Sequence, residues 1–246
     1  MQTLLVTEVR EVDKQRVFEG DTVLFNDGSG ARRTVKWPVR MQTMGALCCA
    51  HVLMRQPIVF VGGVHGSGKT TICRLIAEAY PAVHVTAGAL IREAADASYV
   101  VTVGAQDKAV PDVDANQAVL LRGLEAYRAR TGEDVRLLLL DGHFSLTDAG
   151  GTLVDVPLAV FREIGPGAVL LVETDPAMVH QRLAVRAVDA PSSETITRMG
   201  ARERERATTT ADALDIPMWV VGGDGPAEEA AHAALSYLRS FLRSEA

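Results

Sequence analysis

The segment of residues 63–70 brings together residue types that can bind phosphate. It reads Gly-Val-His-Gly-Ser-Gly-Lys-Thr and matches the pattern G-x-x-x-x-G-K-[ST] in full. Glycines let successive backbone N–H groups turn inward around an anion, and the start of a following helix adds the positive end of its dipole. Lysine suits phosphate oxygens at this position, and threonine suits the coordination shell of Mg²⁺. The segment is therefore predicted to be a Walker A loop (P-loop) that binds a nucleoside triphosphate, with ATP and Mg²⁺ as the expected cofactors.

The stretches on both sides of this loop support the same interpretation. Ile58–Val61 is a short apolar run typical of a buried strand, and Thr70–Ala79 places its apolar residues on one helical face. Lys69 is expected to reach the β- and γ-phosphates and to take part in catalysis, while Thr70 is expected to bind the metal. His65 is expected to contribute its backbone. The expected contacts to the nucleotide are Gly63, His65, Gly66, Ser67, Gly68, Lys69, Thr70 and Thr71.

An acidic residue follows a second strand-like run. Residues 137–140 are four consecutive leucines, and Asp141 comes directly after them. Parallel sheets bind ligands at the carboxyl ends of their strands, so Asp141 is predicted to hold Mg²⁺ or a water of its shell and to take part in catalysis. A solvated turn at Asp141-Gly142 is the alternative.

Alternating strand and helix patterns position these residues. Further strand-like runs occur at Val83–Val85, Ala168–Val172 and Met218–Val221. Helical patterns separate the runs, at Ala89–Ala95, Ala115–Ala129, Ala177–Val188, Glu194–Leu214 and Ala227–Leu242. Strands that alternate with helices indicate a three-layer α/β/α domain with a five-stranded parallel sheet covered on both faces. This domain is predicted to span residues 57–246.

The first 56 residues have a different pattern. Thr22–Phe25 and the alternating Val35, Trp37 and Val39 suggest strands on either side of a turn-rich stretch at residues 26–30. A small β-rich appendage is therefore predicted at residues 1–40, followed by a connecting helix at residues 41–56. The alternative is that these strands extend the main sheet.

Net charge, apolar content and cysteine count limit the partners and the location that the sequence predicts. The net charge of −6 argues against nucleic acid as a partner. No window reaches the roughly 18 apolar residues that a membrane span needs. The cysteines are Cys48, Cys49 and Cys73, a set that favours neither a disulfide framework nor a zinc site and predicts a cytoplasmic location.

Four segments within residues 57–221 resemble P-loop nucleoside monophosphate kinases, particularly compact adenylate kinases of archaeal-like type. The first is the loop at residues 63–70 with the additional Thr71. The others are Val85–Arg92, similar to S-x-G-D-L-L-R, Asp141–Phe144, similar to D-G-F-P-R, and Arg182–Arg186, similar to R-L-x-x-R. The resemblance implies a P-loop kinase fold, with a short lid near residues 187–197 over the ATP.

The resemblance also implies roles for individual residues. Arg92 would grip the acceptor phosphate, Arg182 would stack on adenine, and Arg186 would touch phosphate as a catalytic residue. The acceptor is expected to contact Thr86, Gly88, Arg92, Gln117 and His143. Two alternatives stay open: Gln117 can belong to a capping box that opens a helix at Asp114, and His143 can be a structural histidine.

Two positions depart from the family pattern. Ala89 stands where the family has aspartate, and Ser145 stands where it has a phosphate-binding arginine, which puts AMP itself in doubt as the acceptor.

Farther along, Arg198, Arg202 and Arg206 recur on one face of a predicted helix. The guanidinium groups of these three arginines can stabilise the transferring phosphoryl group. Arg202 is the catalytic candidate of the three. A solvated helix of alternating charge is the competing interpretation.

The function predicted from these features is transfer of the γ-phosphoryl group of Mg²⁺-ATP to a small acceptor, expected to be a nucleotide. Two alternatives remain. One is a kinase of a non-nucleotide alcohol, in which Asp141 or His143 would accept the hydroxyl proton. The other is a regulatory ATPase that engages a protein partner through residues 1–40.

Overall fold

The computed structural model describes residues 3–5, 22–26, 32–36, 56–95, 113–132, 135–148, 151–185 and 190–244. The chain divides into two compact units, Met1–Arg55 and Gln56–Ala246. Within the described residues, no helix is both long enough and apolar enough to cross a membrane.

The described strands of the first unit form a sheet of their own. Strand β1 (Thr3–Leu5) runs parallel to β2 (Thr22–Asn26), which pairs antiparallel with β3 (Arg32–Lys36). The β-rich character predicted for this appendage is therefore present. The expected strand positions Trp37 and Val39, and residues 41–55 of the expected connecting helix, lie outside the described residues.

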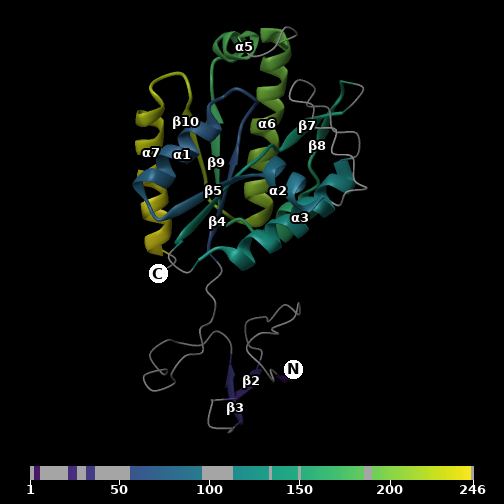
Figure 1. Cartoon of the computed structure of the whole chain (residues 1–246), viewed down its shortest axis with the longest axis vertical. Helices are drawn as coiled ribbons and strands as arrows, with labels where there is room; N and C mark the ends of the chain where they lie inside the picture. Colours follow the sequence, from purple (N-terminus) through teal and green to yellow (C-terminus); the bar gives the residue numbers. More distant parts are fainter. Residues whose placement is uncertain are drawn as a thin grey trace. The chain divides into compact units, whose positions relative to one another are not determined.

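Five parallel strands form the centre of the second unit, in the order β10-β9-β4-β6-β5 (Figure 1). They are β4 (Ile58–Gly62), β5 (Ala82–Thr86), β6 (Leu137–Asp141), β9 (Ala168–Glu173) and β10 (Met218–Gly222). The described helices of this unit are α1 (Lys69–Ala79), α2 (Ala87–Ala94), α3 (Val113–Arg130), α4 (Leu158–Ile164), α5 (Pro176–Ala184), α6 (Ser193–Leu214) and α7 (Ala227–Ser244). This architecture confirms the predicted α/β/α fold.

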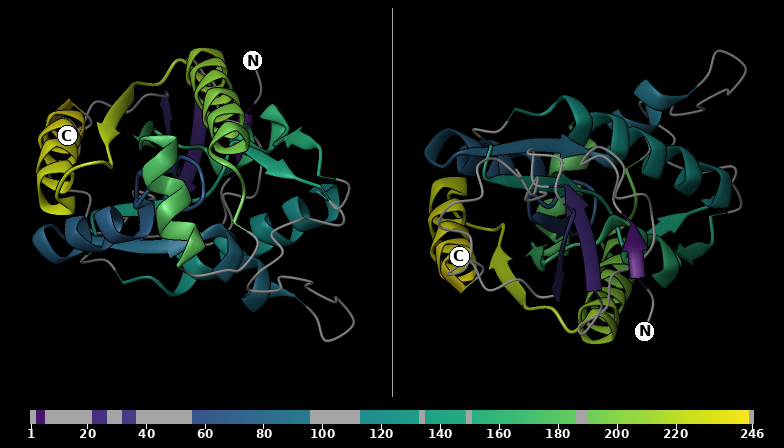
Figure 2. Two further views of the ribbon diagram at one scale, coloured as in Figure 1. Left: turned by 90° about the horizontal axis from the view of Figure 1, so that it is seen from above. Right: turned by 90° about the horizontal axis from the view of Figure 1, so that it is seen from below.

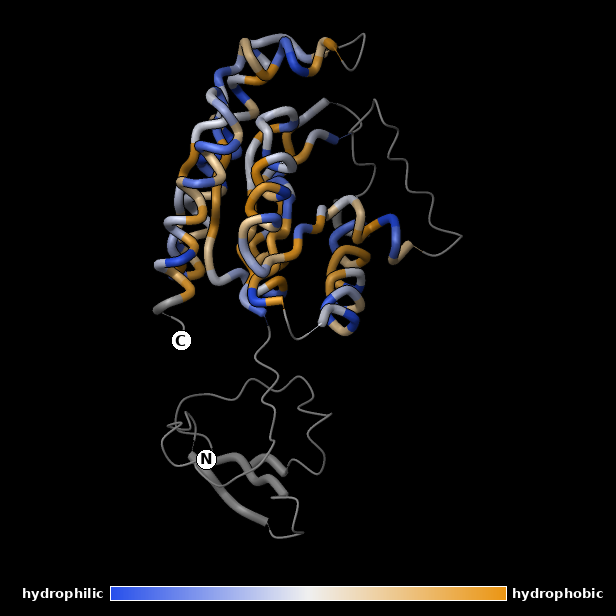
Figure 3. Tube along the Cα trace, turned by 60° about the vertical axis from the view of Figure 1, so that its left-hand side comes forward, coloured by the Kyte–Doolittle hydropathy of each residue, from blue (hydrophilic) through white to orange (hydrophobic). Residues whose placement is uncertain are grey.

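Alternate residues of the strands build two cores, one on each face of the sheet. In β4, Val59 and Val61 pack against α1 and α7, whereas Ile58 and Phe60 pack against the layer formed by α2, α3, α4 and α6. Figure 2 shows α1 beside α7 and away from α6. Apolar residues concentrate along the central strands (Figure 3). Because both faces are covered, these strands have continuous apolar sequences.

Three described elements of the second unit were not predicted. A short hairpin pairs β7 (Ser145–Thr147) with β8 (Leu153–Asp155), and α4 follows it. Helix α4 ends at Gly165, whose positive φ of 63° suits a residue without a Cβ. The hairpin begins four residues after Asp141, so it extends the loop that leaves the sheet at the site.

Phe161 of α4 joins an aromatic cluster beneath that loop. Its ring stacks on Phe144 at 5.0 Å between centroids and meets the edge of Phe60 at 5.1 Å. Phe161→Ala is expected to lower the free energy of unfolding by about 3–5 kcal/mol, because the site is fully enclosed and would keep a cavity. Urea unfolding followed by circular dichroism measures the loss. Val220→Ala, at a side chain 37% exposed, serves as the control and should cost about 0.5 kcal/mol. Similar losses in both variants would contradict this account of the core.

Candidate active site

The phosphate loop connects β4 to α1 at the carboxyl edge of the sheet. Gly63, Gly66 and Gly68 have φ values of 138°, 82° and 99°, a region that residues with a Cβ rarely adopt. A Cβ on Gly63 would also lie 2.3 Å from the carbonyl oxygen of Val172. The motif glycines are therefore required by backbone conformation, which makes an incidental glycine-rich turn a poor explanation of this segment.

Lys69 lies inside this loop with its side chain buried. Its Nζ donates hydrogen bonds to the carbonyl oxygens of Gly63 at 2.6 Å and Val64 at 3.1 Å, and lies 4.0 Å from Oδ1 of Asp141. Burial lowers the pKa of Lys69, while the carboxylates of Asp141 and Glu203 act in the opposite sense. The ammonium group is thus held by carbonyl oxygens that phosphate oxygens could replace.

Thr70 and Asp141 meet next to Lys69. The Thr70 hydroxyl donates a 2.7 Å hydrogen bond to Oδ2 of Asp141, and Nε2 of His84 lies 3.5 Å from the same oxygen. Burial raises the pKa of Asp141, but His84, Lys69, Thr70 and His143 outweigh it and hold the pKa below its usual value. Asp141 is therefore an ionised carboxylate at neutral pH.

This pair fits Mg²⁺. Magnesium keeps several waters and takes one or two protein oxygens together with substrate phosphates, so it needs no cage of protein ligands. The described residues contain no group of three or more histidine, cysteine, aspartate or glutamate side chains that could hold a metal. Thr70 and Asp141, the two metal ligands predicted from the sequence, are the residues that would hold Mg²⁺ here.

Sequence reasoning missed Glu203, a buried glutamate of α6. Its Oε1 accepts hydrogen bonds from the backbone N–H of Gly63 and Phe144, each at 3.0 Å, and its Oε2 accepts from Ser145 N–H at 2.9 Å. His143 Nδ1 lies 3.6 Å from Oε1. The glutamate thus links α6 to both loops of the site.

Arg182, the first of the two predicted lid arginines, lies in α5. Arg182 donates to the carbonyl oxygens of Gly66 at 3.3 Å and Gly223 at 2.8 Å, which places its guanidinium group against the phosphate loop. Arg186 lies outside the described residues. Val64 of the loop packs against residues of α5 and α6, namely Val179, Leu183, Ile196 and Met199. The first turns of α6 occupy residues 193–197 of the predicted lid.

Three of the predicted acceptor residues, Gly88, Arg92 and Gln117, lie in α2 and α3, and Thr86 comes directly before α2. Thr86 caps α2 by accepting a 3.0 Å hydrogen bond from Ala89 N–H, and Arg92 extends alongside Gly88. Gln117 is buried, and its Oε1 accepts no hydrogen bond from the described part of the chain. Helix α3 already begins at Val113, so Asp114 lies inside its first turn rather than before it. This start does not match the capping box considered for Gln117.

Two arginines of α6 that were predicted to face the transferring phosphoryl group, Arg202 and Arg206, instead lie beside the carboxylate of Asp155. Arg202 is held by Asp155, through a 2.8 Å bond from Nε to Oδ1 and a 2.5 Å bond from Nη2 to Oδ2, and also by Glu205 at 2.7 Å. Arg206 lies 3.3 Å from Asp155. Asp155 comes from strand β8, which was not predicted, so these ion pairs could not be predicted from the sequence. A catalytic role for Arg202 would require it to leave them and stays a prediction.

A cavity of about 510 Å³ adjoins the start of the phosphate loop. The ends of β9 and β10 form one wall and α6 forms the other. Glu173 and Arg204 form an ion pair in its lining. Arg204 of α6 thus has a defined partner.

Comparison with known proteins finds a family match and a curated relative for this chain. Residues 62–199, more than half of the chain, match the family AAA_17, described as an AAA domain. A cytidylate kinase of Citrifermentans bemidjiense is 37% identical over 82 residues, which cover 33% of this chain and 32% of that protein. The chain thus matches about a third of the length of this curated relative.

Two solved structures to which this chain is similar are described as kinases. A gluconokinase from Sinorhizobium meliloti 1021 has a TM-score of 0.47 and 17% identity, covering 77% of this chain and 95% of its own. A sugar kinase from Janibacter sp. HTCC2649 has a TM-score of 0.46 and 22% identity, covering 75% and 95%. The phosphate loop, the sheet order and the family match together confirm the resemblance to P-loop nucleotide kinases, and the chain belongs to the AAA_17 family of AAA domains.

Proposed function

We propose that this protein transfers the γ-phosphoryl group of ATP to a small acceptor and that the acceptor is a nucleotide. The observation that carries the proposal is the 2.7 Å hydrogen bond between Thr70 and Asp141 beside the buried Lys69. The groups proposed to bind phosphate and metal thereby lie together at one edge of the sheet. The relationship to a cytidylate kinase over 82 residues supports a nucleotide as the acceptor.

The residues of the chain would act mainly by holding ATP and the acceptor in position for transfer. Lys69 would exchange its two carbonyl partners for oxygens of the β- and γ-phosphates, and the N–H groups at the start of α1 would bind the β-phosphate. Mg²⁺, held by Thr70 and Asp141, would supply charge neutralisation on the phosphates. Arg182 would hold the nucleotide from the lid side. Exclusion of water by the lid would favour the acceptor over hydrolysis.

Arg92 is proposed to bind the acceptor. Its side chain is exposed and forms no hydrogen bond or ion pair with the described part of the chain, so it is available to an anion. Nearby, the unpartnered Oε1 of Gln117 could accept a hydrogen bond from an acceptor base. An acceptor with both a phosphate and a base would satisfy the two groups at once.

Arg92→Ala is expected to raise the KM for the acceptor by about 10²-fold, because a charge-assisted contact to a bound anion is lost. The affinity for ATP should stay within a factor of about 2, since Arg92 lies on α2 and not on the phosphate loop. Steady-state kinetics with each substrate varied in turn give both values. Arg239→Ala, on α7 behind the opposite face of the sheet, is the matched control. Equal losses for ATP and acceptor would make Arg92 a structural residue.

A kinase of a non-nucleotide alcohol is the second candidate. Ser145, at the position of a phosphate-binding arginine in the resembling family, instead donates a 3.1 Å hydrogen bond to Asp155. The acceptor side therefore lacks one cation, which favours a neutral acceptor. In that case Asp141 or His143 would accept the hydroxyl proton.

An acceptor screen separates these candidates. The purified chain is incubated with Mg²⁺-ATP and, in parallel, with each nucleoside monophosphate and a panel of sugars and other alcohols. ADP formation that depends on a nucleoside monophosphate is the expected result. Dependence on an alcohol would replace the nucleotide proposal, and ADP formation indifferent to every acceptor would indicate an ATPase.

A further inference from the structure

Glu203 has an unusual environment for a residue in a run of alternating charges. The side chain lies on α6, yet the residue is only 2% exposed. Phe144 N–H is shared between its two oxygens at 3.0 Å, while Gly63 N–H binds Oε1 and Ser145 N–H binds Oε2. Each carboxylate oxygen therefore accepts two backbone hydrogen bonds.

These donors come from the two segments on which the site depends. Gly63 begins the phosphate loop, and Phe144 and Ser145 follow the Asp141 loop. The acceptor belongs to a third element, α6, whose first turns pack Ile196 against Val64 and α5. A single carboxylate thus joins the phosphate loop, the loop after Asp141 and helix α6.

The environment does not suit Glu203 as a proton acceptor. Its oxygens are already occupied by N–H donors. Burial raises the pKa of Glu203, but His143, Lys69 and the Phe144 N–H lower it more, so that the group is held below its usual pKa. An occupied, weakly basic carboxylate acts through the segments that it holds.

We infer that Glu203 is a positioning residue that fixes the phosphate loop and the segment after Asp141 relative to each other and couples both to α6. The N–H groups of Gly63 and Ser145 approach different oxygens of one rigid, planar group, so their separation is set by that group. Any displacement of α6 would therefore act on both segments. This inference rests on the proposed phosphoryl transfer for its kinetic test only.

The geometry requires a carboxylate and not merely a polar side chain. A glutamine has one oxygen and one NH₂ group, and either orientation places a donor against a backbone N–H donor. With NH₂ at the Oε1 position the Gly63 bond is lost, and with NH₂ at the Oε2 position the Ser145 bond is lost. Glu203→Gln keeps the size of the side chain and therefore tests the hydrogen bonds and the charge.

Glu203→Gln is expected to lower kcat by about 10²-fold, because a misplacement of about 1 Å in a catalytic site has that effect. The KM for ATP should change by less than about threefold, since Lys69 and the loop N–H groups remain. The control is Asp212→Asn, which replaces an exposed carboxylate on the same helix by a carboxamide. It should leave kcat and the KM for ATP unchanged. A lower melting temperature with an unchanged kcat per folded molecule would reduce Glu203 to a structural role and overturn the inference.

Hydrogen exchange tests the coupling without relying on transfer. Mg²⁺ and a non-hydrolysable ATP analogue are titrated into the full chain, and exchange is followed in peptides covering residues 60–66, 142–147 and 198–206. In the wild type all three peptides should gain protection with the same concentration dependence, whereas in Glu203→Gln only the first should respond. Protection confined to the phosphate loop in the wild type, or coupled protection that survives in the variant, would overturn the inference.

These two readouts separate the inference from the proposed function. If the wild type transfers phosphate to no acceptor in the screen, the proposed function fails while the exchange experiment still decides the coupling. If Glu203→Gln does not fold, the exchange response of the wild type alone decides whether the three segments are coupled. Transfer that is intact in the wild type together with uncoupled exchange would keep the function and discard the inference.

Discussion

Lys69→Ala is expected to lower kcat/KM for ATP by about 10³-fold, the range found when one preorganised donor to developing negative charge is removed. The physical reason is that Lys69 is the cation of the phosphate loop and lies buried between the carbonyl oxygens of Gly63 and Val64. Alanine leaves the negative charge of the phosphates without that partner. Turnover assays and equilibrium binding of an ATP analogue measure the loss.

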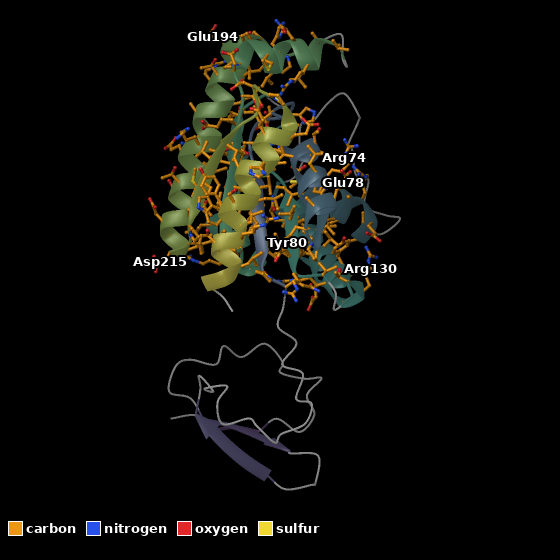
Figure 4. The ribbon with its side chains drawn as sticks, turned by 90° about the vertical axis from the view of Figure 1, so that its left-hand side faces the viewer. Arg74, Glu78, Tyr80, Arg130, Glu194 and Asp215 are labelled. Atoms are coloured by element: carbon orange, nitrogen blue, oxygen red, sulfur yellow. The ribbon has the colours of Figure 1, made fainter. Side chains whose placement is uncertain are left out.

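The matched control for this substitution is Arg74→Ala on the same helix. Arg74 and Glu78 lie on the outer surface of α1 (Figure 4), where their charged atoms are 3.9 Å apart and both side chains are largely exposed. Loss of an exposed pair costs about 0.5 kcal/mol of stability and should not alter ATP binding. A folded Lys69→Ala variant with the ATP affinity and turnover of Arg74→Ala would refute the assignment of the loop.

Asp141→Asn is expected to lower kcat by about 10²- to 10³-fold and to raise the Mg²⁺ concentration needed for half-maximal activity. Asparagine keeps the size of the side chain but removes the negative charge, so a hard divalent cation loses its ionised ligand. The Thr70 hydroxyl also loses its charged acceptor, a bond that is 2.7 Å long in the native chain. Rates measured across a Mg²⁺ titration give both parameters.

Asp215→Asn provides the corresponding control at the surface. Asp215 ends α6 with a positive φ of 53°, a conformation that asparagine also tolerates, and it lies far from α1 at the lower end of α6 (Figure 4). Its replacement should leave the Mg²⁺ dependence unchanged. Should Asp141→Asn show the same Mg²⁺ dependence as the wild type, Asp141 would not be a metal ligand.

The sheet and its main helices could be predicted because their signals are local. Ile58–Gly62, Leu137–Asp141 and Ala168–Glu173 are apolar along their length since both faces of the sheet are covered. The phosphate loop could be predicted because its conformation requires glycine at fixed positions, such as Gly63 and Gly68. Asp141 could be placed from the rule that ligands bind at the carboxyl ends of parallel strands.

The hairpin of β7 and β8 could not be predicted in this way. Each strand has three residues, too few to establish an alternating pattern, and their pairing depends on contacts between Ser145 and Asp155. The partner of Arg202 was missed for the same reason, because Asp155 reaches α6 only through that hairpin. Non-local pairing of this kind leaves no periodic signal in the sequence.

Glu203 was missed for a different reason. It lies between Arg202 and Arg204, so its surroundings in the sequence are those of a solvated helix. The available signal was its spacing: the buried positions of α6 are Ile196, Glu203, Ala207, Thr210 and Ala211, and Glu203 falls on that stripe. A charged residue in register with an apolar stripe indicates a buried, hydrogen-bonded carboxylate.

The most direct test of the account follows the γ-phosphoryl group through one turnover. Enzyme in excess is mixed with ATP labelled at its γ-phosphate, Mg²⁺ and each nucleoside monophosphate, and the products are separated by chromatography. The label is expected to appear in a nucleoside diphosphate, at a rate that Lys69→Ala lowers about 10³-fold. Label released only as inorganic phosphate, at the same rate with and without acceptors, would contradict the proposal that this protein is a kinase.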